Sequence, residues 1–268
     1  MIALQSLHDH LAALDGAVLG YSGGVDSALL AVVACRALGR DRFVAVIGRS
    51  ASYPAVQHAA ALALATRFDV PVCEVDTHEM EDERYLANPV DRCYFCKHEL
   101  WTRLGEIAVA RGIGIILDGT NADDLGEHRP GLRAAAELRV RSPLAELGWT
   151  KAMVREASRA LDLPTSDAPA APCLSSRVRY GLAITPARLA QVERGEAFLR
   201  ALGVRGDLRV RHLGASARIE VLVAEMPTLQ SEWAAVREHF AALGFAAVDL
   251  DPRGYRRGSL LVLESGAA

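Results

Sequence analysis

Short apolar runs alternate with longer amphipathic segments in the first part of the chain. The runs are rich in Val, Ile and Leu and lie at residues 17–21, 43–47, 70–75 and 114–118. Segments long enough for crossover helices fill residues 27–38, 54–68 and 97–111, and Thr150 is a favourable N-cap for a further helix over 151–161. This alternation predicts an α/β fold, with a parallel sheet covered by helices on both faces.

The later part of the chain has a different pattern. Residues 164–172 are rich in Pro and Ala and have no periodic apolar face, which is typical of a hinge. Beyond them, Thr185 and Pro186 are suited to begin a helix that runs to about Leu202. Strands are predicted at 208–212, 217–223, 246–250 and 260–263, with a helix at 231–243. We therefore expect an N-terminal domain of residues 1–165, a hinge loop of residues 166–183 and a smaller C-terminal α+β domain of residues 184–268.

The most informative motif follows the first predicted strand and begins the next helix. It consists of Ser22, Gly23, Gly24, Val25, Asp26 and Ser27. Glycines permit close backbone approach, and the N–H groups of a first helical turn, with two hydroxyls, favour phosphate. The chain has neither G-x-x-x-x-G-K-[ST] nor G-x-G-x-x-G. We predict a phosphate loop, with Asp26 on a metal ion or in a cap; the alternative is an ordinary helix start.

A second polar loop follows the strand predicted at residues 114–118. It reads Asp118-Gly119-Thr120-Asn121-Ala122-Asp123-Asp124. Ligands of such sheets bind at the carboxyl ends of the strands, so Gly119 and Asn121 are expected to contact the same nucleotide as the first loop. Asp123 and Asp124 offer the hard oxygen ligands that suit Mg²⁺. The alternative is a polar turn with side-chain capping, and the sequence favours neither.

Three of the five cysteines are candidates for chemistry. Cys93 and Cys96 form a C-x₂-C at a loop-to-helix transition, and Cys173 follows the hinge. Together they would suit a [4Fe–4S] cluster with one iron free of protein ligands. Structural zinc with His98, or three unrelated thiols, are the alternatives. Cys35 and Cys73 lie inside a predicted helix and strand and are expected in the core.

Charge and hydropathy restrict the partners. The chain of 268 residues has 30 basic and 33 acidic side chains, a net charge of −3, which gives no general attraction to nucleic acid or anionic membranes. No apolar run reaches membrane-spanning length, and the first residues lack the pattern of a secretion signal. We expect a cytoplasmic protein without a disulfide framework, membrane partner or nucleic-acid partner.

Four motifs taken together resemble the LarE family of ATP-dependent sulfur-insertion enzymes. They are S-G-G-V-D-S, R-C-Y-F-C-K at 92–97, D-G-T-N-A-D-D and P-C-L-S-S-R at 172–177. The first alone is shared by PP-loop ATP pyrophosphatases such as GMP synthetases, NAD synthetases and tRNA-thiolating enzymes. The resemblance implies a Rossmann-like PP-loop domain and conversion of the carboxylates of pyridinium-3,5-biscarboxylic acid mononucleotide to thiocarboxylates. ATP would adenylylate each carboxylate, and sulfur would then displace AMP, on the way to a nickel-pincer nucleotide cofactor.

The family resemblance implies two possible sources of sulfur. Members with only the P-C-L-S-S-R cysteine give up its sulfur and become dehydroalanine. Members with the C-x₂-C as well hold a [4Fe–4S] cluster on three cysteines. Since Cys93, Cys96 and Cys173 are all present, the resemblance favours the cluster, with Cys173 as a sacrificial donor the alternative. The expected catalytic residues are these three cysteines and Asp26.

Two further arginines are candidates for the substrate phosphate. Arg209 and Arg211 alternate, which places two guanidinium groups on one strand face. The resemblance implies a phosphate site at such an R-x-R, while a solvated strand face is the alternative. Glu193 and Glu196 are expected on an exposed helix face; the alternative is a metal at a subunit contact. The expected assembly is a homo-oligomer that hands its product to a nickel-insertion enzyme.

Two rival functions remain from the sequence. PP-loop adenylation with cysteine sulfur would also serve a tRNA thiolase, although no basic run supports RNA binding. A module that senses ATP or a metal without turnover is the other rival. Release of pyrophosphate from ATP distinguishes an enzyme from that module.

Overall fold

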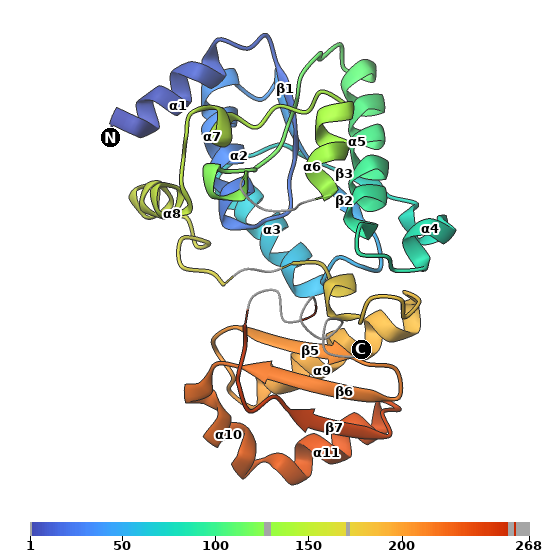
Figure 1. Ribbon diagram of the computed structural model, residues 1–268. Helices are drawn as coiled ribbons and strands as arrows, with labels where there is room; N and C mark the ends of the chain where they lie inside the picture. Colours follow the sequence, from blue (N-terminus) through green and yellow to red (C-terminus); the bar gives the residue numbers. More distant parts are fainter. Residues whose placement is uncertain (1, 126–129, 170–171, 257–259, 261–268) are drawn as a thin grey trace. The chain divides into compact units, whose positions relative to one another are not determined.

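A computed structural model describes residues 2–125, 130–169, 172–256 and 260. The chain forms two compact units (Figure 1). Unit 1 comprises residues 1–85 and 91–168, and unit 2 comprises residues 86–90 and 169–268. Over the described residues, no helix is both long and apolar enough to span a membrane.

Unit 1 contains a four-stranded parallel sheet in the order β3-β2-β1-β4. The strands are β1 (Ala17–Gly20), β2 (Phe43–Arg49), β3 (Val72–Asp76) and β4 (Ile116–Leu117). The helices are α1 (Ile2–Ala12), α2 (Val25–Leu38), α3 (Ala55–Arg67), α4 (Glu83–Leu86), α5 (Arg92–Ala110), α6 (Pro130–Glu137), α7 (Pro143–Glu146) and α8 (Lys151–Ala160). Two short 3₁₀ segments, η1 (Glu79–Glu81) and η2 (Ala122–Asp124), follow β3 and β4.

Both faces of β1, in the interior of this sheet, are covered by apolar side chains. Alternate residues of β1 lie in different apolar clusters, because successive strand side chains point to opposite faces. Leu19 packs in a cluster with Leu29 of α2, whereas Val18 packs in another with Trp101 of α5. The predicted α/β fold, with a parallel sheet covered on both faces, is therefore confirmed.

The start of α5 and the length of β4 differ from the prediction. α5 begins at Arg92, five residues earlier than expected, because Tyr94 packs against the second apolar cluster and extends the buried face of the helix by a turn. Cys93 and Cys96 consequently lie within the first turns of α5. β4 is limited to two residues, which pair with Val18 and Leu19.

Unit 2 is the smaller, mixed α+β unit. Its sheet has the order β5-β6-β7, antiparallel between β5 and β6 and parallel between β6 and β7. The elements are η3 (Leu174–Arg177), α9 (Pro186–Ala201), β5 (Leu208–His212), β6 (Ser216–Val221), η4 (Val223–Glu225), α10 (Met226–Ser231), α11 (Trp233–Ala242) and β7 (Ala247–Leu250). Thr185 caps α9 as predicted, accepting a hydrogen bond from the Arg188 N–H at 3.3 Å. Residues 261–263 of the strand expected at 260–263 lie outside the described residues.

Residues 86–90 belong to unit 2 although they fall between helices of unit 1. The buried Asn88 side chain joins them to the segment after η3. Its Nδ2 donates to the carbonyls of Val178, Arg179 and Leu182 at 3.3, 2.8 and 3.0 Å. The chain therefore passes between the two units three times, at residues 85–86, 90–91 and 168–169.

Candidate functional site

The loop between β1 and α2 depends on glycine. Gly23 has a φ of +70°, and a Cβ there would lie 2.6 Å from that of Ala61 in α3. Tyr21 fixes the same approach by donating from its hydroxyl to the Ala61 carbonyl at 2.9 Å. Gly24 is the N-cap of α2 and has no side chain to cap the helix, so the loop leads to a helix N-terminus suited to an anion.

Hydrogen bonds hold this loop in one conformation. The hydroxyls of Ser22 and Ser27 lie 3.2 Å apart, and the Ser27 hydroxyl donates to the Gly24 carbonyl at 3.1 Å. From the other side, Tyr53 Oη and Gln57 Nε2 donate to the Ser22 carbonyl at 2.9 and 2.8 Å. The serine hydroxyls predicted to meet phosphate thus lie together at the start of α2.

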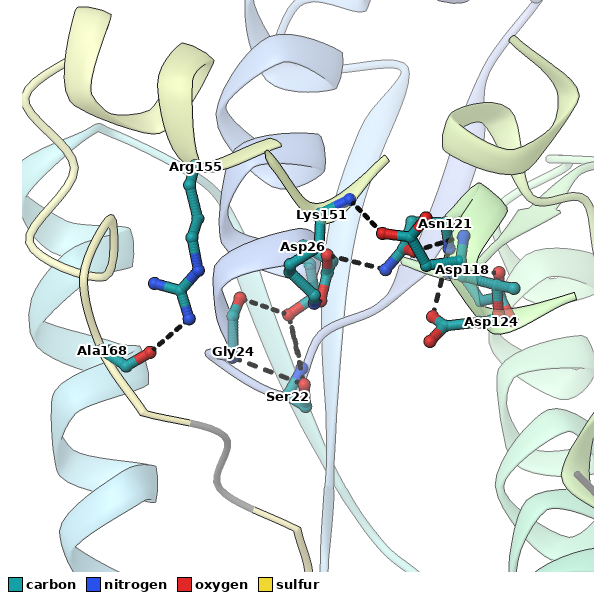
Figure 2. Close-up of polar contacts among 12 residues, drawn as sticks. Ser22, Gly24, Asp26, Asp118, Asn121, Asp124, Lys151, Arg155 and Ala168 are labelled. Carbon is teal, nitrogen blue, oxygen red and sulfur yellow. Dashed lines mark hydrogen bonds and ion pairs between the residues drawn. The ribbon is translucent and has the colours of Figure 1, made fainter. Parts of the chain in front are cut away.

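Asp26 connects this loop to the second polar loop (Figure 2). Its carboxylate accepts a hydrogen bond from Asn121 Nδ2 at 3.1 Å and forms an ion pair with Lys151 Nζ. Gly119 permits the approach, because a Cβ there would lie 2.9 Å from the Ser27 backbone nitrogen. The structure therefore brings Ser22, Asp26, Ser27, Gly119 and Asn121 together at the carboxyl end of the sheet.

The remaining acidic residues act as caps. Asn121 and Asp124 form a capping box on η2, with Asp124 accepting from the Asn121 N–H at 3.3 Å. Asp123 accepts from the Lys151 backbone N–H at 2.8 Å, at the start of α8. Within the part of the chain that the structure describes, no three His, Cys, Asp or Glu side chains form a group that could hold a metal ion. Asp123 and Asp124 thus make the capping contacts of the alternative, and Mg²⁺ binding by Asp26, Asp123 and Asp124 together with ATP phosphates stays a prediction.

Sequence reasoning missed Lys151. It was treated only as the first residue of the helix after Thr150, whose hydroxyl does cap α8 by accepting from the Met153 N–H. The phosphate loop itself contains no lysine. The signal that was missed is the lysine directly after the N-cap Thr150. Lys151 supplies a partly exposed cation beside Asp26, where a polyphosphate would be expected.

The C-x₂-C cysteines belong to unit 1. Cys93 is exposed and Cys96 is half-buried, and both thiols are free of disulfides. A spacing of three residues at the start of α5 puts them on one side of the helix. Cys35 and Cys73 pack against the two apolar clusters, as expected for core residues, although each is only half-buried.

Cys173 lies in unit 2, at the N-cap of η3, and its backbone is clamped by Arg177. The Cys173 carbonyl accepts from the Ser176 N–H at 3.0 Å, the Ser176 hydroxyl at 2.7 Å and Arg177 Nη1 at 3.0 Å. The buried Arg177 also forms a two-pronged ion pair with Glu196, at 2.9 and 3.1 Å. The expectation that Glu196 lies on an exposed helix face was therefore wrong: its side chain is 17% exposed.

Arg209 and Arg211 are both buried, so the solvated-face alternative was wrong. Arg211 donates to the carboxylate of Glu220 and, from Nη1, to the Ser176 carbonyl at 3.0 Å. Arg209 lies over the Tyr255 ring, 5.0 Å from its centroid. Burial lowers the pKa of Arg209 below its usual range, and the nearby Arg177 lowers it further. Arg209 and Arg211 are thus two buried cations, and Arg211 contacts the turn that bears Cys173.

Cys93, Cys96 and Cys173 are not in disulfides, and three thiols are the donor set that a [4Fe–4S] cluster with three protein ligands takes, so the residue types fit the group. Cys93 and Cys96 lie in unit 1 and Cys173 in unit 2, so neither unit by itself contains the full set.

A parallel sheet with an S-G-G-V-D-S loop at the start of a helix defines a PP-loop ATP pyrophosphatase. Residues 4–88 match the family model of NAD synthase. The chain is 33% identical over 92% of its length to pyridinium-3,5-bisthiocarboxylic acid mononucleotide synthase of Lactiplantibacillus plantarum, covering 89% of that protein. It is also 42% identical to an uncharacterised protein of Synechocystis, over 96% of both chains. The chain belongs to the LarE-like family of PP-loop ATP pyrophosphatases.

Proposed function

We propose that this chain inserts sulfur into pyridinium-3,5-biscarboxylic acid mononucleotide, converting its carboxylates to thiocarboxylates at the expense of ATP. The observation that carries the proposal is the group formed by Ser22, Ser27, Asp26, Asn121 and Lys151 in a chain that also has the clamped Cys173 turn. The relative in Lactiplantibacillus plantarum, whose name states the thiocarboxylate product, supports the same chemistry.

Adenylation is assigned to unit 1. The N–H groups at the start of α2, with Ser22, Ser27 and Lys151, bind the β and γ phosphates of ATP. A substrate carboxylate oxygen attacks the α phosphorus, the bond from that phosphorus to the bridging α–β oxygen breaks, and pyrophosphate leaves with the electron pair. Asp26 orients Lys151 and the Asn121 amide, so that donors already face the negative charge that develops on pyrophosphate.

Sulfur transfer is assigned to the cysteines. Cys93, Cys96 and Cys173 would hold a [4Fe–4S] cluster, which when bound supplies a sulfide at the iron without a protein ligand. Arg177 orients the Cys173 turn through its carbonyl. In the alternative route, the Cys173 thiolate bonds to the acyl carbon and AMP leaves. Loss of the Cα proton to solvent and cleavage of the Cβ–S bond then give thiocarboxylate and dehydroalanine.

The substrate phosphate is assigned to Arg209 and Arg211, whose desolvated guanidinium groups would bind it more strongly than exposed ones. A homo-oligomer in the cytoplasm, with transfer of the product to a nickel-insertion enzyme, completes the proposal.

The test is a product analysis with anaerobically prepared protein. ATP and the biscarboxylic acid mononucleotide should give AMP and pyrophosphate in equal amounts, together with a product in which sulfur replaces carboxylate oxygen. The control omits the mononucleotide, and pyrophosphate release should then stop. Formation of ADP and phosphate, or release of pyrophosphate with no need for the mononucleotide, contradicts the proposal.

A further inference from the structure

The backbone carbonyl of Ser22, in the phosphate loop, accepts two hydrogen bonds from side chains at the start of α3. Tyr53 Oη donates to it at 2.9 Å and Gln57 Nε2 at 2.8 Å. Burial raises the pKa of Tyr53, and the Glu74 carboxylate acts in the same direction, so the hydroxyl keeps the proton that it donates. Two side chains of one neighbouring segment therefore fix the direction of a single carbonyl.

The direction of this carbonyl determines the direction of the next N–H. The Ser22–Gly23 peptide is trans, and the C=O and N–H of a planar trans peptide point to opposite sides. Because the Ser22 carbonyl is held toward Tyr53 and Gln57, the Gly23 N–H points away from them. Among the residues that the structure describes, this N–H has no hydrogen-bond acceptor. It is thus a backbone donor available to an anion, as in other anion-binding loops.

Gly23 also allows the same peptide to turn over. Its φ is +70°, and glycine adopts negative φ about as readily as positive φ. Rotation of the Ser22–Gly23 peptide by half a turn would direct the carbonyl oxygen toward the phosphates in place of the N–H, and that oxygen repels an anion. The glycine is required by the close approach to Ala61, so the loop needs another device to keep its peptide in one orientation.

The Gln57 amide is present at a cost to folding. Its Oε1 is buried and makes no hydrogen bond with the described residues, whereas its Nε2 donates to the Ser22 carbonyl. A buried acceptor without a partner destabilises the folded state, and an apolar side chain of similar size would avoid that penalty. The contact with Ser22 is therefore the use of this amide that the structure shows.

We propose that Tyr53 and Gln57 are positioning residues for adenylation: they hold the Ser22–Gly23 peptide with its N–H toward the β and γ phosphates of ATP and prevent its reversal. The inference rests on the proposed function, which assigns those phosphates to this loop. Either donor alone still holds the carbonyl, so loss of one should have a small effect. Loss of both should have the effect of removing a preorganised donor.

The kinetic experiment compares Tyr53→Phe, Gln57→Leu and the double variant by substrate-dependent exchange of labelled pyrophosphate into ATP. Each single change should lower exchange by less than about fivefold, the range of one neutral hydrogen bond. The double variant should lose about 10²-fold or more, which exceeds the product of the single effects. Gln57→Leu should have a urea midpoint equal to or above that of wild type, because it removes the unpartnered oxygen. Lower exchange without lower stability distinguishes positioning from structural support.

A second measurement observes the peptide itself. Serine labelled with ¹³C at the carbonyl and glycine labelled with ¹⁵N together mark two peptides of the chain, Ser22–Gly23 and Ser265–Gly266, and the variant Gly266→Ala identifies the second signal. Inorganic pyrophosphate should shift the Gly23 amide signal of the wild-type protein, and the double variant should lose that shift. In each single variant the Ser22 carbonyl carbon should move upfield, because hydrogen bonding deshields it.

Two matched controls remove the same kinds of donor elsewhere in unit 1. Thr102→Val removes a hydroxyl that donates to the His98 carbonyl at 2.8 Å. Gln5→Leu removes an amide that donates to the Asp9 carboxylate at 2.7 Å. Both variants should exchange pyrophosphate at the wild-type rate.

Wild-type exchange in the double variant, or a Gly23 amide signal that pyrophosphate does not shift in the wild-type protein, overturns the positioning role. If the double variant does not fold, wild-type exchange and an unmoved Ser22 carbonyl signal in both single variants overturn it. If the wild-type protein catalyses no exchange while pyrophosphate still shifts the Gly23 signal, the proposed function fails and the orientation of the peptide stands. The two failures are therefore distinguishable.

Discussion

Arg211 donates two hydrogen bonds to the Glu220 carboxylate, from Nε at 3.0 Å and from Nη2 at 2.8 Å. The side chains are 7% and 1% exposed, so the ion pair is shielded from water. Because Arg211 also donates to the Ser176 carbonyl, the pair connects the sheet of unit 2 to the turn that bears Cys173. A residue expected only to bind phosphate therefore also supports the turn that bears Cys173.

Arg211→Ala should lower the free energy of unfolding by about 3–5 kcal/mol, because it leaves Glu220 buried without its charged partner. It should also raise the mononucleotide concentration required for half-maximal turnover, while ATP binding in unit 1 is retained. Chemical denaturation and nucleotide titration measure the two effects. Arg218→Ala is the matched control on the neighbouring strand, since its pair with Asp249 is partly exposed and should contribute less than about 1 kcal/mol. Equal destabilisation by both changes, or loss of ATP binding in folded Arg211→Ala, would contradict this assignment.

Lys151→Met should lower adenylation by roughly 10²-fold, as expected for one preorganised group that stabilises developing charge. Asp26→Ala should have an effect of similar size, since it removes the group that orients Lys151 and Asn121. Pyrophosphate exchange measures both. Arg159→Met, two turns further along α8, should be near wild type. Normal exchange in both site variants would place the nucleotide elsewhere.

Much of the α/β fold was predictable because its signals are local. Apolar runs that are buried on both faces identified β1 and β2 almost to the residue, and Thr150 and Thr185 identified the starts of α8 and α9. The start of α5 was missed because Tyr94 is amphipathic and its burial depends on a distant cluster. The short length of β4 likewise depends on a distant element, because its two residues pair with Val18 and Leu19 of β1.

The phosphate loop was predictable for the same local reason, whereas its partners were not. Asp26 and Lys151 are separated by 125 residues, and only the topology brings them together. The pairing of Arg177 with Glu196 likewise depends on how η3 packs against α9. Charge and hydropathy along the chain contain no information about such partner choice.

Gly119→Ala should impair adenylation and lower the free energy of unfolding. The new Cβ would lie 2.9 Å from the Ser27 backbone nitrogen, so the backbone of one of the two loops would have to shift. We expect at least a tenfold loss of pyrophosphate exchange and a lower midpoint in urea. The matched change Gly105→Ala introduces a Cβ into open space within α5 and should stabilise the chain by about 0.5–1 kcal/mol. Wild-type exchange in Gly119→Ala would show that the two loops need not approach so closely.

Stability should fall in mild acid because of His212. Burial lowers the pKa of His212 to about 4 from the usual 6.5, with the nearby Arg188 acting in the same direction. Between these values the unfolded chain binds a proton that the folded chain does not, so folding is weakened as the pH falls from 6.5 toward 4, by up to about 1.4 kcal/mol per pH unit. Urea denaturation at pH 7 and pH 5 measures the effect. His212→Gln should reduce this dependence, whereas the control variant His8→Gln, altered at an exposed site, should retain it.

The source of sulfur is decided by iron content and polypeptide mass measured on the same sample. If Cys93, Cys96 and Cys173 hold a cluster, reconstituted protein should contain about four irons per chain. Each Cys→Ser change should then abolish both iron binding and activity, because serine is a poor ligand for soft iron–sulfur sites. Supplied sulfide should support repeated turnovers with the mass of the chain unchanged. Cys35→Ser is the matched control, since that thiol packs against the core, and it should retain iron and activity.

The sacrificial route predicts the opposite behaviour, because the sulfur then comes from the side chain itself. Iron-free protein would be active for one turnover per Cys173 thiol, and Cys93→Ser and Cys96→Ser would leave that turnover intact. Conversion of Cys173 to dehydroalanine removes the elements of H₂S, about 34 mass units, with the thiolate acting as the nucleophile. The position of the mass change matters as much as its size, since only loss at Cys173 follows from this chemistry. An active, iron-free chain that has lost this mass at Cys173 would exclude the cluster, whereas an unchanged mass after several turnovers would exclude the sacrificial cysteine.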